Sequence, residues 1–269
     1  MRKNFVRNRI AGVVCAALLG MGGIASAEVI AHETIYQPAL LQSLTAGYYD
    51  GFVTMHQVHT MGDTGLGTFE GVNGEMIMLD GHIYQALGDA TVVEAAETET
   101  TPFCTVTYFE EDGSFDVKDI QSLSDLQKKL DEVVAQNGRN NFYMVRVDGD
   151  FEKVYARSER KQTPPYEPLV KVLERDQVEY SFDDLKGTIV AIYCPPYMSQ
   201  LNALGWHFHF ISDDRKKGGH VFEMKMRNGT VSYDVTREFH MVLPKSEEFG
   251  KLDLAKDQSK DIQKVEQGK

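Results

Sequence analysis

Cysteine is scarce in this chain, with three residues among 269. Cys15 lies close to the N-terminus, so only Cys104 and Cys194 are left for the body of the chain. Small exported domains that depend on disulfides carry cysteine at a much higher density, so the sequence excludes a disulfide-rich scaffold. Both remaining cysteines lie in apolar, strand-like segments, and two alternatives stay open: one disulfide, or two buried thiols.

Positive charge is also in short supply, because 28 Lys and Arg residues face 40 Asp and Glu residues and leave a formal net charge of -12. Surfaces that grip phosphate backbones or anionic lipid need the opposite balance, so the composition argues against nucleic acid and membrane as partners. Hydrophobic residues make up 42% of the chain and charged residues 25%, which is typical of a folded globular protein.

The first 27 residues have the three parts of a secretory signal peptide. An apolar run over residues 10–19 is followed by small residues that end in Ala25-Ser26-Ala27, and it is preceded by the basic residues Arg2, Lys3, Arg7 and Arg9. An uncleaved membrane anchor is the alternative, but the apolar run is short for a bilayer span. We therefore expect a cleaved signal peptide and an exported protein, periplasmic or secreted, that has no membrane segment after cleavage.

The pattern of apolar residues predicts an α+β protein with many strands and few helices. Helical spacing is found over residues 38–48, over a segment capped by Ser124, over 169–173 and in the charged tail. Residues 52–59 read as a strand. The pairs Asp80-Gly81, Asp148-Gly149 and Asn228-Gly229 are type I′ turn signals, so each predicts a hairpin between the apolar segments that flank it.

Three prolines within residues 164–168 interrupt the pattern and predict a boundary between two sheet-containing domains. The expected parts are a mixed sheet with helices over residues 28–160, a mainly antiparallel sheet over 161–250, and a tail over 251–269 that is a candidate to fold back over the site. Residues 67–75 resemble residues 220–230. A duplicated α+β unit is one explanation, and chance convergence of hairpins is the other.

Three histidines form the strongest chemical signal, because His207 and His209 lie two residues apart in a strand-like segment and His220 follows a polar loop. Alternate residues of a strand share a face and lie about 6.6 Å apart, so two imidazoles can converge on one ion. Phe208 and Phe210 then face the core. A return strand would add the third imidazole, and three imidazoles with an open position are typical of catalytic zinc sites. Two ordinary histidines on a strand surface are the alternative.

The segment from Gly205 to His220 resembles the zinc-binding segment of the acetolactate decarboxylases. The similarity extends in order along nearly the whole chain, through residues 65–69, 73–76, 146–151, 165–169, 187–188 and 243–244. Two departures are visible. Residues 157–160 are more charged than is usual in the family, and Trp206 stands where tyrosine is more common.

This resemblance implies a zinc-dependent carboxy-lyase that converts 2-acetolactate (2-hydroxy-2-methyl-3-oxobutanoate) to acetoin and carbon dioxide, in acetoin and 2,3-butanediol biosynthesis. It also implies a homodimer as a candidate assembly. By resemblance the zinc ligands are His207, His209 and His220. The catalytic residues implied in the same way are Thr68, Glu75, Arg157 and a C-terminal glutamate that is best matched by Glu266.

The implied reaction leaves an electron pair on carbon when carbon dioxide departs, so the site needs a metal, a cation and a proton donor. Arg157 is expected to hold the carboxylate, and Glu75 or Glu266 to donate the proton. Two other classes stay open. A cupin-like metal enzyme shares the histidine pattern but needs a glycine where Leu201 stands. A non-enzymatic exported binding protein is the other.

Overall fold

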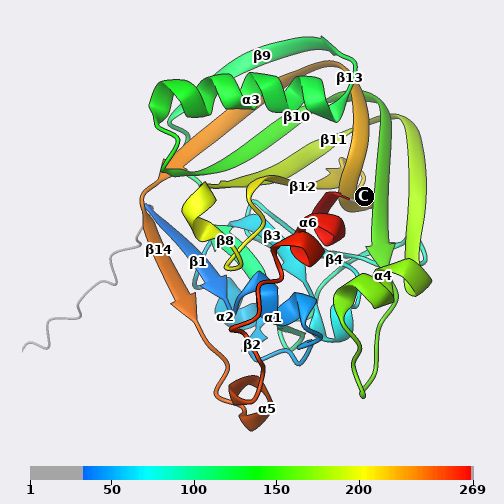
Figure 1. The fold of residues 1–269 in the computed structure, drawn as a ribbon. Helices are drawn as coiled ribbons and strands as arrows, with labels where there is room; N and C mark the ends of the chain where they lie inside the picture. Colours follow the sequence, from blue (N-terminus) through cyan, green and yellow to red (C-terminus); the bar gives the residue numbers. More distant parts are fainter. Residues whose placement is uncertain (1–32, 268–269) are drawn as a thin grey trace, which may run out of the picture. The chain divides into compact units, whose positions relative to one another are not determined.

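Two β-sheets lie face to face, and several short helices lie around them (Figure 1). The structure is a computed structural model and describes residues 33–267, so the predicted signal peptide lies outside the described residues. The described residues belong to a single unit by their contacts. None of the helices between residues 33 and 267 combines the length and the apolar character that a membrane crossing requires.

The first sheet has seven strands in the order β14-β1-β8-β3-β4-β5-β6. Its strands are β1 (Thr34–Pro38), β3 (Thr64–Thr68), β4 (Glu75–Leu79), β5 (His82–Ala86), β6 (Val92–Glu94), β8 (Cys104–Thr107) and β14 (Glu238–Val242). Strand β14 pairs parallel with β1, and the other neighbours are antiparallel. A separate short pair consists of β2 (Val53–Thr54) and β7 (Thr100–Thr101).

The second sheet has five strands in the order β10-β11-β12-β13-β9, and β10 also pairs with β13. Its strands are β9 (Gly113–Ile120), β10 (Phe142–Glu159), β11 (Gln177–Cys194), β12 (Gly205–Ser212) and β13 (Gly218–Thr236). Because the pairing of β10 with β13 joins the two ends of the run β10 to β13, these four strands close on themselves. One face of this sheet packs under helix α3 (Leu123–Asn137), and the other packs against the first sheet (Figure 1).

The remaining helices are short and lie mostly around one end of the sheets. They are α1 (Leu41–Thr45), α2 (Met55–Val58), α4 (Leu169–Asp176), α5 (Glu247–Gly250) and α6 (Ser259–Gln267), with single 3-10 turns at Glu70–Val72 and Pro196–Met198. Helix α6 packs Ile262 and Val265 into an apolar cluster with Leu41 of α1 and Val172 of α4. The C-terminal tail therefore folds back onto the body of the protein.

Helix α3 forms where an apolar face was predicted, but it starts earlier than expected. The hydroxyl of Ser122, not that of Ser124, accepts a hydrogen bond from the backbone N–H of Asp125 and caps the helix. The helix ends at Gly138, which has a φ of 115°. The predicted strand over residues 52–59 is wrong beyond Thr54, because Thr54 and Gln57 form a capping box that starts α2.

One of the three predicted hairpin turns is confirmed, and two are wrong. Asp80 and Gly81 have positive φ values of 52° and 77° and connect β4 to β5. The other two predicted turns, Asp148-Gly149 and Asn228-Gly229, lie inside β10 and β13, and Gly149 is opposite Gly229 on the neighbouring strand. A Cβ on Gly149 would lie 2.5 Å from the carbonyl oxygen of Asn228. These glycines therefore allow two long strands to approach closely, and they do not turn the chain.

The change between sheets does not fall at the proline cluster. The chain leaves the first sheet after β8, enters the second at β9 and returns to the first at β14. The prolines of residues 164–168 lie in the connection from β10 to α4. The strands before and after this connection, β10 and β11, both belong to the second sheet, so the chain does not change sheets at the prolines. The expected division at residue 160 is therefore not the division between the sheets. The two segments that resemble each other also differ, since one contains the β3–β4 connection and the other lies within β13.

The two cysteines of the described region are both buried and free. Cys104 packs in the cluster beneath the first sheet, and Cys194 packs between the sheets. Burial raises the pKa of the Cys104 thiol to about 12. Of the two alternatives that the sequence left open, two buried thiols are therefore the one observed.

Candidate active site and metal centre

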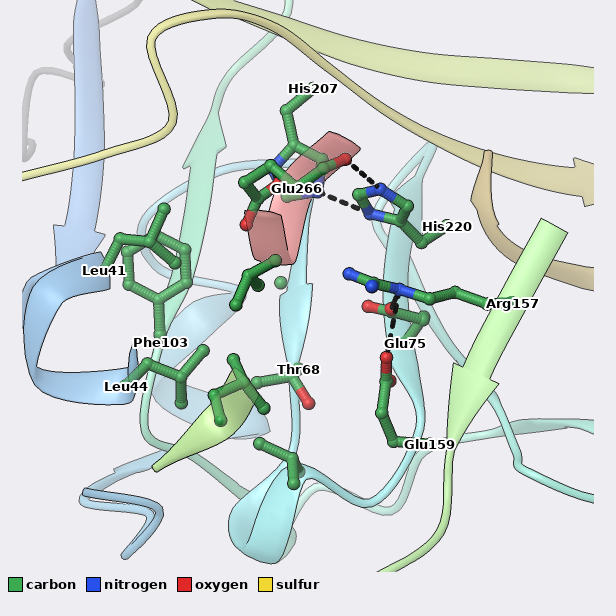
Figure 2. A pocket seen from close by; sticks show the side chains of 14 residues that line it. Leu41, Leu44, Thr68, Glu75, Phe103, Arg157, Glu159, His207, His220 and Glu266 are labelled. Atoms are coloured by element: carbon green, nitrogen blue, oxygen red, sulfur yellow. Dashed lines mark hydrogen bonds and ion pairs between the residues drawn. The ribbon is translucent and has the colours of Figure 1, made fainter. Parts of the chain in front are cut away.

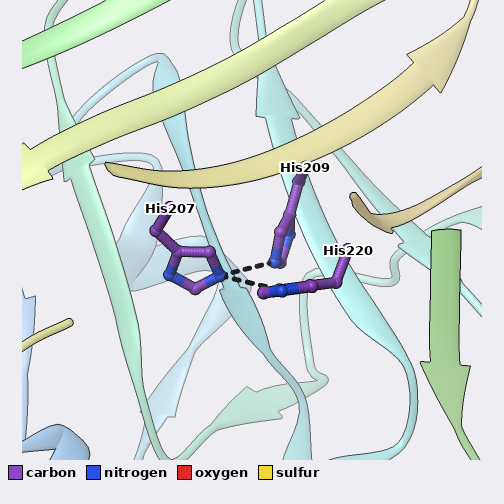
Figure 3. Close-up of side chains that lie close together, drawn as sticks. All are labelled: His207, His209 and His220. Carbon is purple, nitrogen blue, oxygen red and sulfur yellow. Dashed lines mark hydrogen bonds between the residues drawn. The ribbon is translucent and has the colours of Figure 1, made fainter. Parts of the chain in front are cut away.

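Strand register brings the three histidines together. His207 and His209 lie on the same face of β12, and His209 pairs directly with His220 on β13 (Figure 3). Gly219 makes this approach fit, because it has a φ of 149° and a Cβ there would lie 2.4 Å from the carbonyl oxygen of Arg157. The predicted return strand is therefore present, and it places the third imidazole beside the first two.

The imidazole nitrogens converge closely. Nε2 of His207 lies 3.1 Å from Nε2 of His209 and 3.0 Å from Nδ1 of His220. These three nitrogens all lie within 4.8 Å of one another. Nitrogens bound to one tetrahedral zinc at about 2.0–2.1 Å would be roughly 3.3 Å apart, so the donor set fits a metal ion of that size.

Hydrogen bonds on the far side of two rings fix which nitrogen is free. Nδ1 of His209 lies 2.8 Å from the carbonyl oxygen of Met76, and Nε2 of His220 lies 3.0 Å from the carbonyl oxygen of Glu266. A carbonyl oxygen only accepts, so these two nitrogens carry the protons. The lone pairs of the other two nitrogens therefore point at the shared space, as in metal sites where a carbonyl orients the ligand.

Burial keeps the imidazoles neutral. It lowers the pKa of His207 to about 3, with a smaller contribution from the nearby Arg157 guanidinium. Burial also lowers the pKa of His209 and of His220 well below the ordinary value of 6.5. Because a metal ligand must be unprotonated, the three side chains are ready to bind a cation at neutral pH.

Arg157 lies beside the histidines because β10 and β13 pair in a register that places it opposite His220. Its Nε lies 3.2 Å from Oε1 of Glu159 and 3.8 Å from Oε1 of Glu75 (Figure 2). Oε2 of Glu75 lies 3.3 Å from Nε2 of His209. Glu75 thus lies between the cation and the imidazole cluster.

Glu266 reaches the site from helix α6. Its Oε2 lies 3.3 Å from Nδ1 of His207, and neither atom has a hydrogen-bond partner within the described part of the chain. The two atoms are buried in a site that also contains the Arg157 guanidinium. A buried carboxylate oxygen without a hydrogen-bond partner costs free energy. A water molecule or a hydroxyl group of a ligand is suited to donate a hydrogen bond to it at this position.

The three carboxyl groups of the site hold their protons more tightly than usual. Burial raises the pKa of Glu75 well above its ordinary value of 4.5, the Glu159 carboxylate adds to the rise, and Arg157 opposes it. Burial also raises the pKa of Glu159, against the effect of Arg157. Burial raises the pKa of Glu266 to about 7, again opposed by Arg157. Such shifted groups are common where proton transfer occurs.

These side chains line one small cavity. The volume of the cavity is about 40 Å³, which suits a small molecule and not a large cofactor. Thr68 lines it next to Glu75, its strand partner, and donates a hydrogen bond of 2.8 Å to the carbonyl oxygen of Gly74. Leu41, Leu44 and Phe103 form an apolar wall across the cavity from Arg157 (Figure 2), and Leu169 and Val265 also line the cavity.

The structure brings together all seven residues that the sequence predicted for the site. Thr68, Glu75, Arg157, His207, His220 and Glu266 line the cavity, and His209 completes the imidazole cluster. The sequence prediction omits the apolar lining residues and one ionisable residue of the cavity, Glu159. The signal was available, since Glu159 is two residues after Arg157 in a strand and therefore shares its face.

Comparisons with known proteins identify one family. Residues 35–256 match the sequence profile of the family described as Alpha-acetolactate decarboxylase. A relative of that name from Methanosarcina mazei is 39% identical over 236 residues, covering 88% of this chain and 81% of its own. One from Methylococcus capsulatus is 36% identical over 235 residues, covering 87% and 89%.

A solved structure has the same fold. The crystal structure of alpha-acetolactate decarboxylase from Bacillus subtilis strain 168 superposes with a TM-score of 0.83 at 33% identity, covering 87% of this chain and 99% of that one. The fold and these relatives define the protein as a decarboxylase, an enzyme of the carboxy-lyase class. The chain belongs to the alpha-acetolactate decarboxylase family.

Proposed function

We propose that this enzyme catalyses the zinc-dependent decarboxylation of 2-acetolactate to acetoin and carbon dioxide. The observation that carries the proposal is a small cavity that is lined by one guanidinium and three carboxyl groups and borders a cluster of three neutral imidazoles. The names of the relatives at 39% and 36% identity support the choice of substrate. The size of the cavity supports a substrate of a few carbon atoms.

Zinc is the proposed ion because three imidazoles with an open position form a typical catalytic zinc site. His207, His209 and His220 would hold it through the nitrogens that face the shared space. When bound there, zinc would act as a Lewis acid toward the ketone and hydroxyl oxygens of the substrate. Such polarisation replaces the electron sink that an organic cofactor supplies in other decarboxylations.

Arg157 is the proposed binding group for the substrate carboxylate. Its guanidinium end points into the cavity, on the same side as the imidazole cluster (Figure 2). A buried guanidinium pairs strongly with a carboxylate, and it can then stabilise the negative charge that develops as the carbon–carbon bond breaks. The apolar wall opposite, which includes Leu41 and Phe103, suits the methyl groups of the substrate.

The proposed proton donor is a glutamic acid. Loss of carbon dioxide leaves an enediolate, and a proton must then reach carbon to give acetoin. Glu75 and Glu266 both border the cavity, and burial raises the pKa of each, that of Glu266 to about 7, so each holds a proton more tightly than an ordinary glutamic acid. Glu75 lies 3.3 Å from His209 Nε2, and Glu266 lies 3.3 Å from His207 Nδ1. The two candidates therefore lie beside different histidines of the cluster.

The test is turnover of racemic 2-acetolactate by the purified protein, with acetoin and carbon dioxide measured separately. We expect activity that is lost when a chelator removes the metal and is restored when zinc is added back. A cupin-like enzyme would turn over a different substrate. A binding protein without enzymatic activity would take up zinc and give no acetoin, and either result would refute the proposal.

We further propose that the protein is exported after removal of residues 1–27 and acts as a homodimer. The basic, apolar and small-residue parts of the N-terminal segment support export. Mass spectrometry of the protein from its native host should find the mature chain starting at Glu28. Light scattering of that mature protein should give twice the mass of one chain.

A further inference from the structure

Glu159 is a buried carboxyl group of the cavity that has no role in the proposed reaction. Its side chain is about 5% exposed, and it lies at the end of β10. Glu159 and Arg157 are alternate residues of that strand and both line the cavity, while Ser158 between them donates a hydrogen bond of 2.6 Å to the carbonyl oxygen of Ala86. Burying a third carboxyl group in one cavity is costly, so its contacts indicate what it does.

Those contacts are with the two neighbours that the reaction uses. Oε1 of Glu159 lies 3.2 Å from Nε of Arg157, nearer than the 3.8 Å of Glu75 Oε1. The carboxyl groups of Glu159 and Glu75 lie near enough to influence each other, since the Glu159 carboxylate adds to the rise in the pKa of Glu75. In Figure 2 both glutamates lie on the Nε side of the guanidinium, and its other edge points into the cavity.

Two further contacts hold the same guanidinium. Nη1 of Arg157 donates a hydrogen bond of 3.2 Å to Oε1 of Gln177, and the guanidinium carbon lies 5.1 Å from the ring centre of Phe222. The ring restricts the plane of the group, and the hydrogen bond to Gln177 restricts its rotation within that plane. The Glu159 carboxylate attracts the Nε side by its charge, although Nε makes no hydrogen bond within the described part of the chain. Without Glu159, the Nε side would have only the more distant Glu75.

We propose that Glu159 is a positioning residue, which acts through Arg157. It holds the Nε side of the guanidinium so that the other edge is presented to the carboxylate of the substrate. This inference rests on the proposed function, because it assumes that Arg157 binds a carboxylate. It assigns Glu159 no contact with the reacting atoms. Its removal should therefore weaken carboxylate recognition and leave the binding of uncharged ligands nearly unchanged.

The experiment compares two ligands by calorimetry on the zinc-loaded protein. One is 2-hydroxy-2-methylbutanoate, which has the hydroxyl and carboxylate groups of the substrate but lacks its ketone. The other is acetoin, which has no carboxylate. Glu159→Ala should weaken binding of the carboxylate about 10-fold or more and that of acetoin less than about 3-fold. Glu159→Gln keeps an acceptor oxygen at the same reach, so its loss should be smaller.

Glu152→Ala is the matched control, because it removes the same charge from an exposed position of the same strand. It should change neither affinity, and zinc content should be equal in all variants. Equal weakening of both ligands in Glu159→Ala would mean a purely structural role and would overturn the proposal. Tighter carboxylate binding would overturn it too, because Glu159 would then compete with the ligand for Arg157. Failure of the wild-type protein to form acetoin from 2-acetolactate would instead refute the proposed function.

Discussion

The two faces of the five-stranded sheet are built from the same strands, yet they differ in the ionisable groups that they bury. The face under α3 is apolar, and on β12 it carries Phe208 and Phe210. The face toward the first sheet carries His207 and His209 from the same strand, beside apolar residues such as Ile211. A period of two residues is enough to separate a hydrophobic core from a set of buried ionisable groups.

This difference shows which side chains stabilise the fold and which are available for the reaction. Apolar side chains stabilise the folded state when they are buried, whereas buried ionisable groups cost free energy unless they are paired. On the face toward the first sheet, Arg157 pairs with carboxyl groups, and the imidazoles stay neutral. Both faces thus contribute apolar packing to the fold, and the face toward the first sheet also holds the ionisable groups of the candidate site.

The largest effect is expected from breaking the imidazole cluster. His207→Ala, His209→Ala and His220→Ala should each remove bound zinc and abolish acetoin formation, because two imidazoles bind a catalytic metal far more weakly than three. The circular dichroism spectrum should stay close to that of the wild type, since Phe208 and Phe210 still pack on the opposite face. Metal analysis of each purified variant is the measurement. Full zinc occupancy in one of them would remove that histidine from the proposed ligand set.

The next largest effect concerns the helix that closes the cavity. Deleting residues 260–269 removes Glu266 and the apolar contacts of Ile262 and Val265, so acetoin formation should fall by at least about 100-fold. Glu266→Gln keeps those contacts and removes only the ionisable group. If the variant with glutamine is fully active while the truncated protein is not, α6 acts by covering the site. Glu75 is then the better candidate for the proton donor.

A smaller effect, on stability alone, is expected from the apolar face. Phe210 is fully buried and packs edge to face against Phe151, with ring centres 5.2 Å apart. Phe210→Ala should lower the free energy of unfolding by about 3–5 kcal/mol. Zinc content and activity of the folded fraction should stay near those of the wild type, as urea titration and metal analysis can show. Loss of zinc in a variant that is still folded would mean that the two faces are not independent.

The sequence predicted which residues come together in the cavity, but it predicted the fold only in part. Its α+β class was correct, and so was the hairpin at Asp80-Gly81, because a turn between adjacent strands is a local event. The glycines at 149 and 229 carried the same local signal, but they lie where β10 and β13 approach each other. Which of these two roles a glycine has depends on a strand partner about 80 residues away, which local patterns do not specify.

Most of the candidate site residues follow from a family resemblance, and the histidines follow also from their spacing. The distances between them could not be predicted, since they depend on the register of β10, β12 and β13. Glu159 was missed because charge alone does not reveal burial. A glutamate in a stretch with other charges looks solvated, yet here the pairing of its strand turns it into the cavity.

The smallest effect tests a second buried carboxyl group, which lies on the face toward the first sheet but outside the cavity. Asp234 of β13 pairs with Met144 of β10, a residue of the core between the sheets. Burial raises the pKa of Asp234 to about 7, the carboxylates of Asp112 and Glu33 add to the rise, and a hydrogen bond from the backbone N–H of Glu110 opposes it. Unlike the glutamates of the cavity, Asp234 has no assigned part in the reaction.

The pKa of Asp234 determines how stability changes with pH. Between its ordinary value of 3.8 and about 7, the folded protein keeps a proton that the unfolded chain has lost, so the free energy of unfolding falls as the pH rises through this window. Asp234→Asn stays neutral at every pH and can still accept the hydrogen bond from Glu110. The variant should therefore be more stable than the wild type by roughly 2–4 kcal/mol above pH 7, and the difference should vanish toward pH 4. Urea unfolding of both proteins across this range is the measurement. If the difference in the free energy of unfolding were constant with pH, Asp234 would have the same pKa in the folded and unfolded states. Asp234 would then be ionised in the folded protein at neutral pH, and burial would not raise its pKa.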